Sequence, residues 1–192
     1  MIPPPPTHLL RSGQVILVRS GGVLGWLIRR VTGQWNHAAM LDAMEPQAPI
    51  LLEARDLKGV AASGWTAWIA ARTVQRLLVL DVPRMTDGER LNVLTWAYDH
   101  VNKGTRYDVL QLLGIYLRHR LPFLTPDRTL LDSETKMICS EYAARALASA
   151  GYDVTPDGID VSITDPSMLE SGGKLTPVCA WDIEAGWVAR SS

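Results

Sequence analysis

Cys139 is the residue best suited to covalent chemistry in this sequence of 192 residues. Its segment, 137–147 (MICSEYAARAL), has apolar residues at helical spacing, which predicts a helix that begins near Ile138 and ends at Gly151. Cys139 would then lie in the first turn, where unpaired amides and the helix dipole stabilise a thiolate and lower the pKa of the thiol. The ordinary alternative for a single cysteine is a small buried hydrophobic residue.

A nucleophilic thiol requires a base, and the sequence offers four histidines. His8 lies in a proline-rich segment, His100 near the end of an amphipathic helix, and His119 between two arginines, all places where a solvated histidine is ordinary. His37 remains, at the start of a predicted strand in the segment 35–40 (WNHAAM), among small apolar neighbours. His37 is therefore the candidate base, and a structural histidine in the core or at a sheet edge is the alternative.

The third candidate is Glu53, a carboxylate in the otherwise apolar segment 50–54 (ILLEA). A buried charge is costly unless a partner neutralises it. Residues 35–42 and 50–54 flank a turn-like segment, so we expect them to pair as antiparallel strands that place Glu53 near His37. There the carboxylate would orient the imidazole and stabilise its protonated form, as the third member of a triad does. A glutamate that faces water or binds Arg55 is the alternative.

The elements that must position these residues indicate one α+β domain, with a central antiparallel sheet and helices on both sides. Thr86 and Glu89 form a capping-box pattern that predicts the start of a helix. Residues 1–12 contain four consecutive prolines and are expected as an extended tail before a single domain over residues 13–192. Extended segments are predicted at 14–18, 35–42, 50–54, 58–62, 75–82 and 175–181, and the other helices at 23–31, 108–118 and 138–150.

Composition narrows the class of protein. Hydrophobic residues make up 47% of the chain, enough for a sizeable core. The 19 basic and 20 acidic residues give a net charge of −1, which argues against a nucleic-acid partner. The longest apolar stretch, residues 109–117, falls short of the roughly 18 to 20 residues that span a bilayer. With two cysteines and no secretory signal pattern, the chain is expected to be cytoplasmic at synthesis, or phage- or virion-associated.

Taken in order, these motifs resemble the circularly permuted papain-like hydrolases of the NlpC superfamily, especially the YaeF/YiiX-like amidases. In the ordinary arrangement of that superfamily the cysteine comes first, whereas here His37 precedes Cys139 by 139 − 37 = 102 residues, as in the permuted branch. Gln14 stands where the family typically has Asp, and residues 121–136 have no family counterpart. The resemblance covers residues 13–169 and includes the segments 13–17 (GQVIL), 107–108 (YD) and 165–169 (DPSML).

The resemblance implies a cysteine-dependent hydrolase that cleaves an amide or ester through an acyl-enzyme, with Cys139, His37 and Glu53 as the catalytic residues. The main-chain amide of Cys139 would stabilise the oxyanion. Tyr107 would line the substrate pocket or add a hydroxyl, and ordinary packing is its alternative. The implied substrates are peptidoglycan peptides, amino-acid conjugates or lipid amides. The competing functions are acyl transfer of the lecithin:retinol acyltransferase type and a non-catalytic phage or effector binding module.

Other chemical motifs are incomplete. Ser-x-x-Lys occurs at 133–136 and 171–174, but the sequence has neither Ser-Asp-Asn nor Lys-Thr-Gly to complete a penicillin-binding site. The glycines at 21–25 lack the Lys and Ser/Thr of a phosphate loop, and no zinc-ligand spacing is present. We therefore expect no metal and no cofactor, and interpret Cys179 as an inert core residue.

Overall fold

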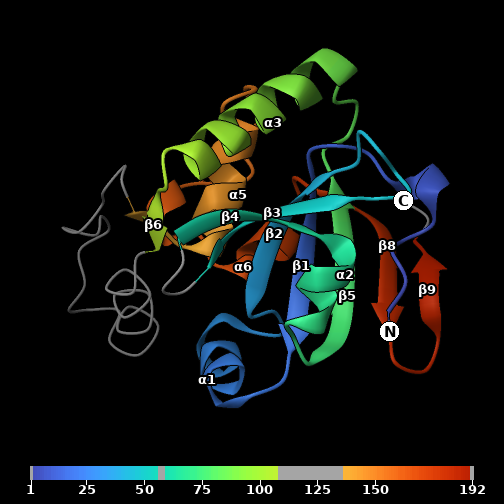
Figure 1. Cartoon of the computed structure of the whole chain (residues 1–192). Helices are drawn as coiled ribbons and strands as arrows, with labels where there is room; N and C mark the ends of the chain where they lie inside the picture. The colour runs from blue at the N-terminus through green and yellow to red at the C-terminus, as the bar shows by residue number, and fades with distance from the viewer. Residues whose placement is uncertain (1, 56–58, 108–135, 191–192) are drawn as a thin grey trace, which may run out of the picture.

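The structure is a computed structural model that describes residues 2–55, 59–107 and 136–190. Its main element is a seven-stranded antiparallel sheet (Figure 1). The strand order is β4-β3-β2-β1-β5-β8-β9. A separate pair, β6 (Arg106–Tyr107) and β7 (Lys136–Met137), is parallel. The strands of the large sheet are β1 (Gln14–Ser20), β2 (His37–Asp42), β3 (Ile50–Arg55), β4 (Gly59–Gly64), β5 (Val74–Asp81), β8 (Thr176–Asp182) and β9 (Gly186–Ala189).

The sheet has two apolar faces because successive side chains of a strand point to opposite sides. In β1, Val15 and Leu17 belong to one buried cluster, and Ile16 and Val18 to the other. The first cluster lies under α3 (Asp87–Asn102), α5 (Cys139–Ala148) and α6 (Pro166–Ser171), and the second under α2 (Trp65–Ala70). Figure 1 shows α3 and α5 together over one face, and α1 (Val23–Thr32) beyond the end of the central strands. The predicted α+β class with helices on both faces is confirmed.

The predicted elements that fall on described residues are found with shifts of one or two residues. The strand expected from residue 35 begins at His37; just before it, the side chain of Asn36 accepts a hydrogen bond from the Ser20 amide (2.8 Å) at the end of β1. The sequence did not predict α2, α6 or β9, which are too short to show a period. The helix expected at 108–118 and the segment 121–135 lie outside the described residues.

The N-terminal segment packs against the face that carries α2. The indole of Trp65 donates to the carbonyl of Ile2 (3.0 Å), and the indole of Trp187 donates to the carbonyl of Pro3 (2.9 Å). Pro5 and Leu10 are buried, and a 3-10 turn covers Thr7–Leu9. Residues 2–10 therefore extend the second apolar cluster, where the sequence predicted a tail.

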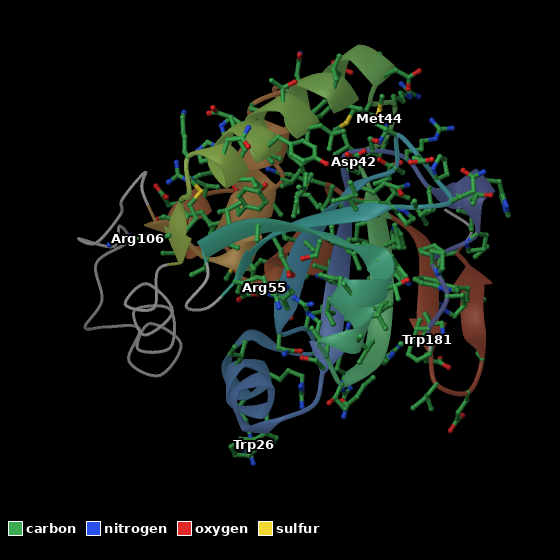
Figure 2. The ribbon with its side chains drawn as sticks, in the orientation of Figure 1. Trp26, Asp42, Met44, Arg55, Arg106 and Trp181 are labelled. Atoms are coloured by element: carbon green, nitrogen blue, oxygen red, sulfur yellow. The ribbon has the colours of Figure 1, made fainter. Side chains whose placement is uncertain are left out.

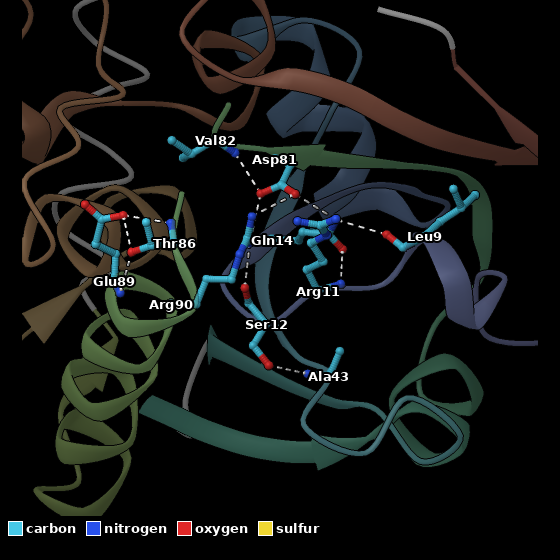
Figure 3. A network of polar contacts seen from close by, with 10 residues as sticks. All are labelled: Leu9, Arg11, Ser12, Gln14, Ala43, Asp81, Val82, Thr86, Glu89 and Arg90. Atoms are coloured by element: carbon cyan, nitrogen blue, oxygen red, sulfur yellow. Dashed lines mark hydrogen bonds and ion pairs between the residues drawn. The ribbon is translucent and has the colours of Figure 1, made fainter. Parts of the chain in front are cut away.

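Figure 3 shows a polar network that ties this segment to β1, β5 and α3. Gln14 donates to the carbonyl of Leu9 (3.1 Å) and to Asp81 (3.2 Å), and Arg90 binds Asp81 (3.0 Å) and the carbonyl of Ser12 (2.8 Å). In β1, Gln14 pairs with Leu41, at the opposite end of β2 from His37. Gln14 thus has a structural role far from the candidate base.

The predicted capping box is present at the start of α3. The Thr86 hydroxyl accepts from the Glu89 amide (3.3 Å), while the Glu89 carboxylate accepts from the Thr86 amide (2.7 Å). Thr86→Ala should therefore lower the free energy of unfolding by about 1 kcal/mol, as measured by urea denaturation. Thr95→Ala is the matched control, because its hydroxyl bonds only a carbonyl inside the same helix. An equal loss in both variants would contradict a specific capping effect.

Candidate active site

Cys139, His37 and Glu53 come from three elements that converge at one end of the sheet. His37 is the first residue of β2, Glu53 lies in β3, and Cys139 is the first residue of α5. The Nε2 of His37 lies 2.5 Å from Oε2 of Glu53, and the charge and hydrogen bonding of Cys139 also act on the imidazole and raise its pKa. Because Glu53 occupies Nε2, the other ring nitrogen, Nδ1, serves the thiol. The imidazole therefore stands between the carboxylate and the sulfur.

The local geometry of β2 opens space for this arrangement. Its ladder with β3 covers only Met40–Asp42 against Ile50–Leu52, so the two strands are unpaired at the level of His37. The register Met40↔Leu52, continued along the strands, sets His37 opposite Arg55 and puts the side chains of His37 and Glu53 on the same face. The helix α5 packs on β2 and β3 and brings its N-terminus to this gap.

Several contacts favour the thiolate form of Cys139. Burial alone would raise the pKa of the thiol, since the side chain is only 5% exposed. The charge and hydrogen bond of His37, together with the amides of Ala38 and Ser140 that face the sulfur, instead hold this pKa below its ordinary value. The first intrahelical bond of α5 runs from the Tyr142 amide to the Ile138 carbonyl, so the positive end of the helix dipole also lies at Cys139.

His37 is held in the complementary, protonated form. Burial by itself would lower its pKa, but the neighbouring charges and hydrogen bonds of Cys139 and Glu53 outweigh it and raise the pKa to about 9. The pKa of the thiol is lowered and that of the imidazole is raised, and both shifts favour the thiolate–imidazolium pair over the neutral pair. Such a pair is the resting form of a nucleophile that needs no further activation.

Glu53 is fully buried and has more partners than the sequence suggested. Burial would raise its pKa, but the charges and hydrogen bonds of His37, Arg72 and Trp68 lower it to about 2. The Trp68 indole donates to Oε2 (2.7 Å), and Nη2 of Arg72 donates to both carboxylate oxygens (2.5 and 2.6 Å). Arg55 also contacts Oε1 through Nε (3.2 Å). The alternative of a glutamate facing water is therefore wrong, whereas the contact with Arg55 exists beside the one with His37.

Trp68 and Arg72 are site residues that sequence reasoning missed. They lie at the C-terminal half of α2 and just beyond it, one helical turn apart. Nη1 of Arg72 donates to the Trp68 carbonyl (2.8 Å), and its guanidinium lies 4.5 Å from the centre of the indole ring. The only signal for them in the sequence is a Trp-x-x-x-Arg spacing after the Glu53 strand, which is weak by itself.

The remaining candidates are placed as follows. The backbone of Tyr107 lies in β6 and pairs with Met137 of β7, two residues before Cys139. His100 stacks on Trp96 with ring centres 3.8 Å apart and bonds its carbonyl, which is a packing role on α3. Burial raises the pKa of Cys179 to about 12, so this thiol stays protonated at neutral pH. His119 lies outside the described residues.

The fold matches a solved structure. Superposition on the crystal structure of metalloprotein yiiX from Escherichia coli O157:H7 (DUF1105) gives a TM-score of 0.63 over 88% of this chain and 96% of that chain. The chain has a yiiX-like fold. At 17% identity this likeness concerns the fold alone. No protein-family model and no curated protein matches the sequence.

The matched protein, yiiX, is a metalloprotein. In the part of the chain that the structure describes, no three His, Cys, Asp or Glu side chains are grouped so that they could hold a metal ion. Both oxygens of Glu53 already accept from Arg72, and a cation there would meet two guanidinium groups. Glu53 in this yiiX-like fold therefore does not fit the role of a metal ligand.

Among the described residues, no helix is both long and apolar enough to cross a membrane.

Proposed function

We propose that this chain is a cysteine-dependent hydrolase with a permuted papain-like site, which cleaves an amide or ester bond through an acyl-enzyme. The observation that carries the proposal is the position of His37 between the Cys139 sulfur and the Glu53 carboxylate, with the pKa of the thiol lowered and that of the imidazole raised. Perturbed titration of this kind, combined with matching geometry, is typical of nucleophilic sites.

In the proposed reaction the Cys139 thiolate attacks the carbonyl carbon of the substrate and forms a tetrahedral oxyanion. The main-chain amide of Cys139, at the open start of α5, donates to that oxyanion. As the carbon–nitrogen or carbon–oxygen bond breaks, the imidazolium of His37 gives its Nδ1 proton to the leaving group. A thioester and a neutral His37 remain.

The second half of the reaction restores the protein. Neutral His37 takes a proton from water, the hydroxide attacks the thioester carbon, and the carboxylic acid product leaves as the sulfur regains its negative charge. Glu53 holds the imidazole through Nε2 and stabilises its positive charge in both halves. An alcohol or amine in place of water would give acyl transfer through the same thioester, so analysis of the products distinguishes the two outcomes.

Alkylation with iodoacetamide tests the proposal without a known substrate. At about pH 6.5 an ordinary thiol is ionised to roughly 1% or less, so it reacts slowly. We expect Cys139 of the folded protein to react at least about tenfold faster than Cys139 of the urea-unfolded protein at this pH. Peptide mapping by mass spectrometry separates its labelling from that of Cys179.

His37→Ala is the control variant, because it removes the imidazolium but leaves the start of α5 in place. Its Cys139 should react more slowly at this pH than that of the wild type. If Cys139 in the folded wild type reacts no faster than in the unfolded chain, the site has no thiolate, and a binding module that retains the fold becomes the better account.

A further inference from the structure

Arg55 is a cationic side chain beside the site, and some of its donors have no partner among the described residues. It ends β3 and stands opposite His37 when the strand register is continued. Its Nε lies 3.2 Å from Oε1 of Glu53, and its side chain is 23% exposed. Figure 2 shows it at the opposite end of the sheet from Asp42 and Met44. Within the described residues, neither terminal Nη group of Arg55 has a hydrogen-bond partner.

Arg72 makes a useful comparison because it contacts the same carboxylate. Its guanidinium binds both oxygens of Glu53, bonds the Trp68 carbonyl and lies over the Trp68 ring, with 13% of the side chain exposed. Arg72 would therefore be a sufficient charged partner for Glu53 without Arg55. Arg55 adds one longer contact through Nε, and no described residue occupies the two terminal Nη groups of its guanidinium.

Among the described residues, the charged groups at the triad leave a positive excess. Glu53 carries −1, Arg72 and Arg55 carry +1 each, and the thiolate–imidazolium pair sums to zero, so the five groups total +1. When the thiolate is converted to an acyl-enzyme, the excess rises until His37 gives up its proton. A bound anion would offset this charge beside the fully buried Glu53 carboxylate.

We propose that Arg55 is a specificity residue that binds a carboxylate of the substrate close to the bond that is cleaved. A guanidinium presents two parallel N–H groups that match the two oxygens of a carboxylate, and Lys cannot reproduce that geometry. The inference deepens the proposed hydrolase function and rests on it, since it names amides or esters with a neighbouring carboxylate as the substrate class.

Two alkylating reagents that differ only in charge test this role. Iodoacetate and iodoacetamide both form a sulfur–carbon bond at Cys139 and release iodide, but only iodoacetate carries a carboxylate next to the reacting carbon. The measured quantity is the rate with iodoacetate divided by the rate with iodoacetamide at Cys139. Because both rates depend on the same amount of thiolate, this ratio reports recognition of the carboxylate. In the wild type this ratio should exceed that of the urea-unfolded protein, and Arg55→Gln should lower it about tenfold.

Two control variants distinguish two-point binding of a carboxylate by the Arg55 guanidinium from non-specific attraction of an anion by positive charge. Arg55→Lys keeps the charge, and its ratio should lie well below that of the wild type. Arg19→Gln removes one charge at the same end of the sheet, where Arg19 contacts Gln75, and its ratio should stay close to that of the wild type. The inference is overturned if Arg55→Gln leaves the ratio unchanged, or if Arg19→Gln lowers it as much.

The same experiment separates the two proposals. Fast reaction of Cys139 with iodoacetamide, together with a ratio that does not depend on Arg55, removes the specificity role and leaves the hydrolase proposal standing. Slow reaction with both reagents removes the thiolate and, with it, both proposals.

Discussion

Cys139→Ala is expected to abolish hydrolysis of any amide or ester that the wild-type protein cleaves, with a loss in kcat of about 10⁴-fold or more. The reason is that the residues of a nucleophilic triad act as a unit, so that without the sulfur neither His37 nor Glu53 has a covalent step to assist. The measurement is the initial rate on a panel of amide and ester substrates, with equal amounts of folded protein.

Cys179→Ala is the matched control, since it makes the same substitution in a buried strand position whose thiol stays protonated. Its rates should equal those of the wild type.

The wild-type rate should also depend on pH, with an alkaline fall at about pH 9 as His37 loses the proton that the leaving group needs. Retention of most of the activity by Cys139→Ala would show that another residue is the nucleophile.

Glu53→Gln should cause the largest loss of stability of any single substitution at the site, about 3 kcal/mol in the free energy of unfolding at pH 7. Glu53 is fully buried, and its two oxygens serve His37, Trp68 and Arg72 together. A neutral amide would leave the Arg72 guanidinium without its counter-charge and would direct N–H groups at other donors. Urea denaturation measures the loss.

Asp99→Asn provides the surface counterpart, because its ion pair with Lys103 is exposed and should contribute at most about 0.5 kcal/mol.

The pH dependence of the free energy of unfolding supplies a second measurement of the role of Glu53. The pKa of Glu53 is about 2 in the folded state against 4.5 for the ordinary group, so the unfolded chain binds more protons between these values. The stabilisation is complete above pH 4.5 and is lost as the pH falls toward 2. In Glu53→Gln this acid-dependent component should be absent; a wild-type acid profile in the variant would count against the depressed pKa.

The sequence predicts best those parts of the molecule whose information is local. The capping box at Thr86 and Glu89 and the β-branched strand of residues 14–18 are specified within a few residues, and both are found. The start of α5 is found at Cys139 because a helical apolar pattern begins there.

The parts that escaped prediction depend on contacts between distant segments or on very short elements. The six residues of α2 show no usable period, so nothing in them indicated that Trp68 would face Glu53. The docking of the N-terminal prolines depends on the indoles of Trp65 and Trp187, of which the second lies 184 residues from its partner. The order of two strands was enough to propose that Glu53 lies near His37. The same information did not predict that two arginines would surround Glu53.

The spacing of the site along the chain bears on the order in which it assembles. The contacts of Glu53 with His37, Trp68 and Arg72 span 16, 15 and 19 residues, whereas Cys139 is 102 residues from His37. Closing the longer loop costs about 1.6 kcal/mol more than closing the 16-residue one. We therefore expect the acid–base half to form early during synthesis, and the reactive sulfur to gain its low pKa only after α5 has docked. A newly made chain would then carry an ordinary thiol until the fold is complete, which protects it from premature alkylation or oxidation.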